Sequence, residues 1–252
     1  MNINYALISA LSAESAGLTV TDIIVGNHLS GVRLSNGAVG VASTEPHAGD
    51  GPPPGAENVT GLQAAAVIDY LAQPGMARRS VALATVNAVN QSRAARYPLD
   101  TSNQVMFDAL GIERGSRVAM VGYFSSLLPR LEERGALVEI VDRSRGMGEP
   151  DDFNKKLGNW TDALLLTGTS ILNNTMEEIL NQCHPGVKVA ILGPTTPLVP
   201  EAFAGYNVRI LAGTVVSDGA AVFSLIAQGM GTRAIHAHSR KVYCTLPAFQ
   251  TG

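Results

Sequence analysis

Residues 164–180 read LLLTGTSILNNTMEEIL, so a run of leucines is followed at once by hydroxyl and amide side chains. Thr175 and Glu178 have the spacing of a capping box, which predicts a helix that begins near Thr175. A single helix cap does not require as many polar groups as residues 167–170 and Asn173 supply. We therefore expect these groups, with the free N–H groups of the helix start, to bind a polar or anionic ligand.

Comparable polar or glycine-containing loops follow other apolar runs, at Gly122, Asp142 and Gly193. Because ligands of parallel sheets bind at the carboxyl ends of the strands, these loops are expected to surround one site. Phe124 would give that site an apolar wall. The predicted ligand-binding residues are Asn87, Asn90, Gly122, Tyr123, Phe124, Asp142, Thr167, Gly168, Thr169, Ser170, Asn173, Gly193, Pro194, Thr195 and Thr196.

Two groups of residues could ligate a metal. His236 and His238 would lie on one side of an extended segment, and Cys244 follows six residues later, so they could form a soft-metal site. His47 and Asp50 belong to a loop rich in Gly and Pro that could fold over the ligand. Spacing alone does not define a coordination geometry, so a polar C-terminal tail is the alternative for the first group.

The first predicted strand–helix turn tests for a dinucleotide site. It reads GYFSS from Gly122, and it lacks the second and third glycines of G-x-G-x-x-G, which argues against a standard NAD-dependent dehydrogenase. Asp142 does stand twenty residues after Gly122, where a ribose-binding carboxylate is found in such enzymes. The sequence contains no P-loop, no H-E-x-x-H and no G-x-S-x-G around Ser125.

The elements that would position these residues fall into two parts. In the first part, alternating residues flank Asn36-Gly37, which predicts a β-hairpin because both turn positions need a positive φ. A strand is predicted at residues 22–28, and helices at residues 60–71 and 78–91. We assign residues 1–76 to a small α+β domain.

From residue 116 onward, short apolar runs alternate with helical patterns. The runs cover residues 117–121, 137–141, 163–166, 187–192 and 208–211. Such runs indicate parallel strands that are buried on both faces. The sequence thus predicts an α/β protein in which residues 77–252 form a Rossmann-like, doubly wound parallel sheet, with the small domain packed against its carboxyl edge.

The composition excludes several classes of protein. The 252 residues carry a net charge of −3, so no basic stripe is available to bind nucleic acid. No apolar run is long enough to span a membrane. With an N-terminus that reads as an amphipathic helix and only two cysteines, a cytoplasmic protein with reduced thiols is expected. Charged residues make up only 15% of the chain, which indicates much buried surface and is compatible with a buried interface between the subunits of a homo-oligomer.

The ordered set of motifs resembles a known family. It consists of Asn87–Asn90 (NAVN), residues 121–124 (VGYF), residues 167–170 (TGTS) with Asn173, and residues 192–197 (LGPTTP). Over residues 78–231 the chain is similar to the putative heavy-metal chelation family, a Rossmann-like domain of unknown function. The resemblance implies an enolase N-terminal-like domain in front and a ligand site between the two domains. The chain departs from the family pattern at position 123, where it has Tyr123 and the resemblance leads us to expect a histidine, which counts against a proton-transfer or ligand role there.

Two functions follow from these expectations. In the first, a binding protein holds a heavy-metal ion or a metal chelate in the crevice between the domains. In the second, an enzyme, such as a small-molecule transferase, uses a nucleotide-type cofactor in the same crevice. The strand ends offer hydroxyls, amides and backbone groups but no thiol or imidazole, so they suit a metal that is already chelated by a small molecule better than a bare soft ion.

Overall fold

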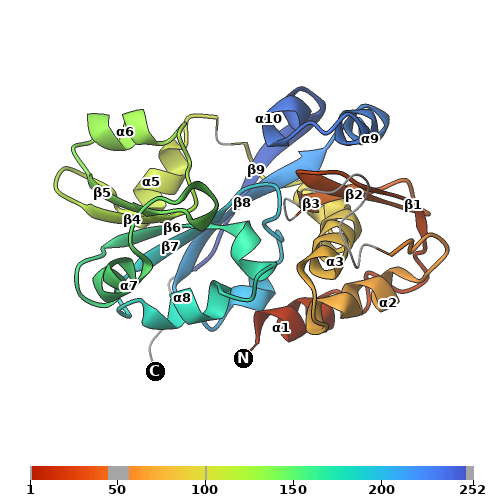
Figure 1. The fold of residues 1–252 in the computed structure, drawn as a ribbon, viewed down its shortest axis with the longest axis horizontal. Helices are drawn as coiled ribbons and strands as arrows, with labels where there is room; N and C mark the ends of the chain where they lie inside the picture. The colour runs from red at the N-terminus through yellow and green to blue at the C-terminus, as the bar shows by residue number, and fades with distance from the viewer. Residues whose placement is uncertain (1, 45–56, 100, 248–252) are drawn as a thin grey trace.

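The computed structural model describes residues 2–44, 57–99 and 101–247. They form a three-stranded antiparallel sheet and a separate six-stranded sheet that is mostly parallel, with helices around both (Figure 1). The predicted α/β class is confirmed. None of the helices in these ranges has both the length and the apolar character needed to cross a membrane.

The small sheet contains the predicted hairpin. Its strands, in spatial order, are β1 (Val20–Val25), β2 (Leu29–Leu34) and β3 (Val39–Ser43), and each neighbouring pair is antiparallel. In the turn between β2 and β3, Gly37 has a φ of 83°, but Asn36 does not have the positive φ that was expected of both positions, so that part of the prediction is wrong. A glycine is favoured there because it adopts this left-handed conformation without steric cost.

The large sheet has the strand order β5-β4-β6-β7-β8-β9. Its strands are β4 (Arg117–Val121), β5 (Leu137–Val141), β6 (Ala163–Thr167), β7 (Lys188–Leu192), β8 (Val208–Val216) and β9 (Ser239–Thr245). The first five are parallel and correspond to the five predicted apolar runs. β9 is antiparallel to β8 and was not predicted. It belongs to the C-terminal segment with Cys244, for which a polar tail was the sequence-based alternative to a metal site.

Helices cover both faces of the large sheet (Figure 1). Met120 of β4 packs with Phe107 and Leu131 on one face, whereas its neighbour Ala119 packs with the cluster that includes Leu157 on the other. This alternation produces a doubly wound sheet. The helices are α5 (Gln104–Leu110) and α6 (Leu128–Glu133) on the first face, and α7 (Pro150–Asn159) and α8 (Met176–Gln182) on the second.

Apart from two short 3-10 helices at the ends of β5 and β6, the remaining helices pack mainly around the small sheet and its contact with the large one (Figure 1). They are α1 (Ile3–Ala10), α2 (Ala64–Ile68), η1 (Asp69–Ala72), α3 (Met76–Val89), α4 (Gln91–Ala94), η4 (Pro200–Phe203), α9 (Gly219–Ala227), α10 (Thr232–Ile235) and η5 (His236–His238). α3 lies against β2 and β3. The division of the chain into domains at residue 76, where α3 begins, stays a prediction.

Hydrogen bonds fasten the small sheet to the carboxyl edge of the large one. The Ser43 backbone N–H donates to Thr195 Oγ1 at 2.8 Å, so the end of β3 is bonded to the loop that follows β7. The Asn87 side chain on α3 donates to Val41 O at 2.9 Å and to Pro194 O at 3.2 Å. These bonds hold the small sheet, α3 and the β7 loop in one arrangement beside the strand ends.

Candidate ligand site at the strand ends

Two cavities meet where the strand order of the large sheet reverses. The chain passes from β4 to β5 on one side and then to β6 on the other side of β4, so the loops after β4 and β6 separate from each other. This is where open α/β sheets bind ligands. The inner cavity has a volume of about 360 Å³ and the outer cavity about 920 Å³. Both are lined by Tyr123, Phe124, Arg145, Thr167 and Thr169.

The floor shared by the cavities carries a pair of hydroxyls. Gly122 has a φ of 88°, and a Cβ atom there would stand 3.1 Å from the Cβ of Thr167, so only glycine permits this turn and this approach. Thr167 Oγ1 and Thr169 Oγ1 are 2.9 Å apart, and Thr167 Oγ1 also accepts the Thr169 N–H at 3.3 Å. One hydroxyl donates to the other, which leaves the second proton for an oxygen of a ligand.

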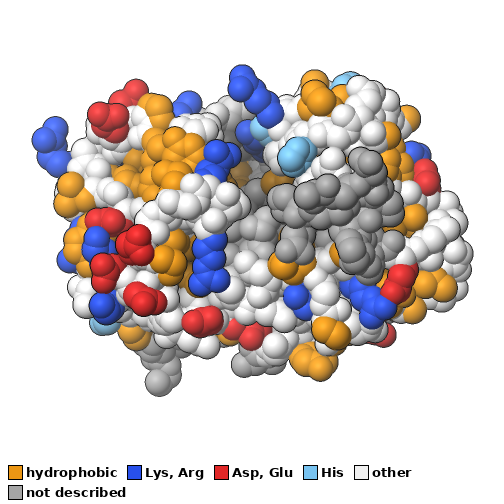
Figure 2. Space-filling model, viewed as in Figure 1, with side chains coloured by type: hydrophobic (Ala, Val, Ile, Leu, Met, Phe, Trp, Pro, Cys, Tyr) orange, Lys and Arg blue, Asp and Glu red, His pale blue; other side chains and the backbone are white. Residues whose placement is uncertain are grey.

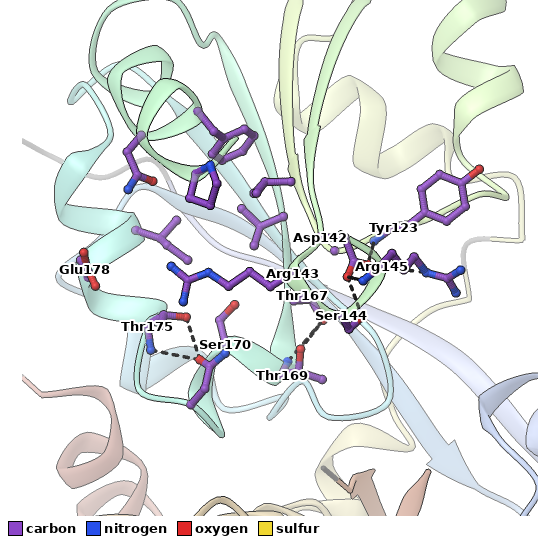
Figure 3. Close-up of a pocket in the computed structure, with 18 of the residues that line it drawn as sticks. Tyr123, Asp142, Arg143, Ser144, Arg145, Thr167, Thr169, Ser170, Thr175 and Glu178 are labelled. Atoms are coloured by element: carbon purple, nitrogen blue, oxygen red, sulfur yellow. Dashed lines mark hydrogen bonds and ion pairs between the residues drawn. The ribbon is translucent and has the colours of Figure 1, made fainter. Parts of the chain in front are cut away.

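Asp142 organises the turn that follows β5 (Figure 3). Its Oδ2 accepts the Tyr123 N–H at 2.9 Å, and its Oδ1 accepts the Ser144 hydroxyl at 2.6 Å and the Arg145 N–H at 3.2 Å. The Nε of Arg145 lies 3.7 Å from Oδ2. Because its two oxygens together accept these three hydrogen bonds, Asp142 positions η2 (Arg143–Arg145) beside the turn that follows β4.

The two arginines of η2 leave the turn in opposite directions (Figure 3). Arg143 extends toward Ser170 on the side of α8, whereas Arg145 extends toward Tyr123. The guanidinium carbon of Arg145 lies 5.2 Å from the centre of the Tyr123 ring, so the aromatic face helps to orient this cation. The turn therefore delivers positive charge both to the inner cavity and to its junction with the outer one.

The turn after β6 differs from the predicted capping box. Thr175 makes no side-chain hydrogen bond to a helix N–H; instead its hydroxyl donates to Asn173 Oδ1 at 2.7 Å, and its N–H donates to the same oxygen at 3.2 Å. Asn174 has a φ of 57°, and this left-handed residue places Asn173 over the start of α8. Ser170, in η3 (Gly168–Ile171), is only 1% exposed and lines the inner cavity.

The outer cavity is positively charged. It is lined by Arg145, Arg233, His236 and Lys241, and its described lining contains no Asp or Glu. Partial burial lowers the pKa of His236, and the nearby charges of Lys241 and Arg233 lower it further. In Figure 2, Lys and Arg side chains border the hollowed middle of this face, while Asp and Glu lie toward the outside. An anion is therefore favoured here although the whole chain has a net charge of −3.

Most of the residues predicted to bind a ligand line these cavities. Gly122, Asp142, Ser170 and Asn173 line the inner cavity alone. Gly193, Pro194 and Thr195 line the outer cavity alone, and Tyr123, Phe124, Thr167 and Thr169 line both. That they contact a ligand stays a prediction.

Four predicted residues line neither cavity, and three of them, Asn87, Asn90 and Gly168, hold the framework instead. Asn87 bonds α3 to the β7 loop as described above, and Asn90 donates to Leu198 O at 2.6 Å. Gly168 permits a close crossing of two loops, because a Cβ there would stand 2.7 Å from Thr196 N. Thr196 itself is 1% exposed. Amide side chains that bond to distant carbonyls cannot be told from ligand-binding amides by sequence alone.

The candidate metal ligands of the C-terminal segment do not come together. His236 and His238 lie in η5 rather than in an extended segment, and His238 Nδ1 is 3.7 Å from Asp218 Oδ2. Cys244 is buried in β9. Within the described ranges, no three His, Cys, Asp or Glu side chains are grouped so that they could hold a metal ion. His47 and Asp50 lie outside the described residues.

Both cysteine thiols are expected to react slowly in the folded protein. Burial raises the pKa of Cys183 to about 12 and also raises the pKa of Cys244. Only the thiolate is nucleophilic, so at about pH 8 we expect a disulfide reagent to react at least about 100-fold more slowly with the native than with the unfolded chain. Rapid release of one equivalent of chromophore from the reagent by the native protein would contradict this expectation. It would show that one thiol is accessible and could also bind a soft metal.

The charged residues of the site were missed by sequence reasoning. Arg143 and Arg145 directly follow Asp142 at a predicted strand end, so extending that loop by three residues would have found them. Arg233 and Lys241 carried no such signal, because they reach the outer cavity only through α10 and β9.

Sequence comparisons identify two matching family profiles. One, described as putative heavy-metal chelation, matches residues 105–245, and a second with the same description matches residues 8–90. An uncharacterized protein of Methanocaldococcus jannaschii is 31% identical over 68 residues. That match covers 27% of this chain and 26% of the relative's length.

Two crystal structures of proteins of unknown function share the fold. The protein from Pyrococcus horikoshii has a TM-score of 0.80 and 20% identity, over 98% of this chain and 100% of that one. The protein from Desulfitobacterium hafniense has a TM-score of 0.78 and 21% identity, over 97% of this chain and 98% of that one. At these identities the likeness concerns the fold.

Proposed function

Because the chain belongs to the family described as putative heavy-metal chelation, we propose that it binds a metal already held in an anionic small-molecule chelate. The binding site would be the crevice formed by the inner and outer cavities at the carboxyl ends of β4 and β6. The protein would thereby recognise the oxygens of the chelator and would not replace them as ligands of the metal.

The chemistry of the lining is the observation that carries this proposal. Heavy-metal ions favour thiolate and imidazole ligands, which the described residues do not group around the crevice. The crevice instead presents the hydroxyl pair of Thr167 and Thr169 and the guanidinium groups of Arg143 and Arg145. Hydroxyl and guanidinium groups donate hydrogen bonds to the carboxylate or phosphate oxygens that an anionic chelator exposes. A bare soft cation fits this donor set poorly.

The alternative is an enzyme that uses a nucleotide-type cofactor in the same crevice. In dinucleotide-binding sheets, the acid at the end of the second strand accepts hydrogen bonds from a ribose. Here that acid is Asp142, which accepts hydrogen bonds from the Tyr123 and Arg145 N–H groups and from the Ser144 hydroxyl and keeps capacity for one more donor. The turn after β4 counts against the nucleotide, because it reads GYFSS and lacks the second and third glycines that allow close approach of a pyrophosphate.

Protein purified without a histidine tag tests the two proposals directly. Native mass spectrometry combined with metal analysis is expected to find a metal and an anionic small molecule in one complex with the chain. Retention of a bare metal, with a mass increase equal to the ion alone, would contradict our proposal. A stoichiometric adenosine compound without metal would favour the enzyme.

Calorimetry with a defined chelate provides a second test. We expect nickel citrate to bind more tightly than nickel chloride, and Thr169→Val to weaken binding of the chelate about tenfold, because the variant loses one hydroxyl donor. Thr85→Val is the matched control, since the Thr85 hydroxyl is buried within α3, where it bonds to Val81 O. Equal loss of affinity in both variants would point to a general effect on folding and would contradict a role of Thr169 in the site.

A further inference from the structure

We propose that Arg233 and Lys241 form a second anion-binding subsite in the outer cavity, so that the ligand carries anionic groups at two separated positions. The subsite would take a carboxylate or a phosphate. For the identity of the full ligand this inference rests on the proposed function, but the subsite can be tested by itself.

The two cations come from the C-terminal segment and converge on one cavity. Arg233 is on α10 and Lys241 is on β9, which pairs with β8 so that Lys241 stands opposite Thr214. Thr214 also lines the outer cavity. Because side chains alternate along a strand, Lys241 and Tyr243 project to the same side of β9, and both line the cavity.

The charges of the subsite are not neutralised by acidic side chains of the described residues. In the part of the chain that the structure describes, neither Arg233 nor Lys241 forms an ion pair, and no Asp or Glu lines the outer cavity. Both cations line the same cavity as His236, and their charges help to lower the pKa of that imidazole. Like charges gathered in a concave surface attract an anion more strongly than isolated surface charges do.

The subsite is continuous with the inner cavity. Arg145, Thr167 and Thr169 belong to both cavities, so a ligand bound to the hydroxyl pair can extend toward the C-terminal segment. Arg143 and Arg145 would hold one anionic end, and Arg233 and Lys241 the other. An outer cavity of about 920 Å³ is large enough for a ligand of this kind.

Arg240 offers a matched control for Lys241. It is the preceding residue of β9, it carries the same charge, and its side chain donates to Ala95 O at 3.3 Å on the other side of the strand. Arg240 does not line the outer cavity. Arg240→Gln therefore removes one positive charge from the same strand without removing it from the subsite.

Calorimetric titration of the full chain with inorganic pyrophosphate, and separately with citrate, tests the subsite. We expect Arg233→Gln combined with Lys241→Gln to weaken binding of at least one of these anions by about 30-fold or more, and Arg240→Gln to change it less than about threefold. A larger loss of affinity for pyrophosphate identifies phosphate as the preferred group of the subsite, and a larger loss for citrate identifies carboxylate. Circular dichroism is expected to show the same melting temperature for all three proteins, since these side chains are exposed.

The outcomes separate this inference from the proposed function. Absence of binding of both anions to the unmodified chain, or equal losses in the double variant and in Arg240→Gln, would overturn the subsite. Loss of anion binding in Thr169→Val but not in the double variant would leave the crevice as the site and also overturn the subsite. If the double variant loses anion binding while nickel citrate and nickel chloride bind equally to the unmodified chain, the subsite stands and the proposed function fails.

Discussion

Substitution of Gly40 by alanine is expected to destabilise the protein by about 3 kcal/mol or more. Gly40 lies in β3 at its contact with α3, where an added Cβ would stand 2.1 Å from Ala84 O and 2.2 Å from Ala88 N. Both atoms belong to the helix backbone, so no rotation of a side chain can relieve the clash. α3 would have to move away from β3, which would open a buried contact between them.

Urea denaturation followed by circular dichroism measures this effect. Gly205→Ala is the matched control, because an added Cβ at Gly205 meets no atom within 4 Å and its backbone does not have a positive φ. We expect the control to change the free energy of unfolding by less than about 0.5 kcal/mol. An unchanged urea midpoint for Gly40→Ala would mean that α3 does not pack this closely on β3.

Truncation of Arg79 to alanine is expected to destabilise the protein by about 3 kcal/mol and to weaken binding in the crevice. Arg79 lies on α3 and is buried, and its guanidinium donates to Leu172 O and, at 2.9 Å, to Gln73 O. Burial lowers the pKa of this guanidinium. The truncation leaves both carbonyls without their donor and leaves a cavity in the core.

The expected effect on binding follows from the position of Leu172. This residue directly follows η3, whose Thr169 and Ser170 line the inner cavity, so Arg79 ties the turn after β6 to α3. Without that tie the hydroxyl pair loses its fixed position. Arg79 is a positioning residue, and its loss should lower the affinity for nickel citrate even at temperatures where the variant is fully folded.

The neighbouring Arg78 provides the control for Arg79. Its side chain is 35% exposed and forms an ion pair with Glu57. Exposed ion pairs contribute little, so Arg78→Ala is expected to cost less than about 1 kcal/mol and to leave binding unchanged. Arg79→Lys keeps the charge but cannot reach both carbonyls in the same way, and it should restore only part of the stability. Full stability of Arg79→Ala would contradict the structural role assigned to this side chain.

Local patterns in the sequence determined most of the elements and the loops that line the candidate site. The continuous apolar runs indicated parallel strands because a strand buried on both faces has no polar alternation, and all five of them are strands. Asn36-Gly37 indicated the hairpin because its turn requires a positive φ, which Gly37 has. The polar loops of the inner and outer cavities could be located because they follow these strands directly.

Only the tertiary structure decided which polar groups are free for a ligand. Asp142, Asn87 and Thr175 look alike in sequence as candidate binding or capping groups, but each is engaged by partners that long-range packing or a local turn brings to it. Lys241 enters the outer cavity because β9 pairs with β8 in a register that no local pattern specifies. Hydrophobic periodicity and turn chemistry act over a few residues, so they are visible in the sequence. Which cations come together in a cavity, and which polar groups already have hydrogen-bond partners, depends on contacts between distant segments.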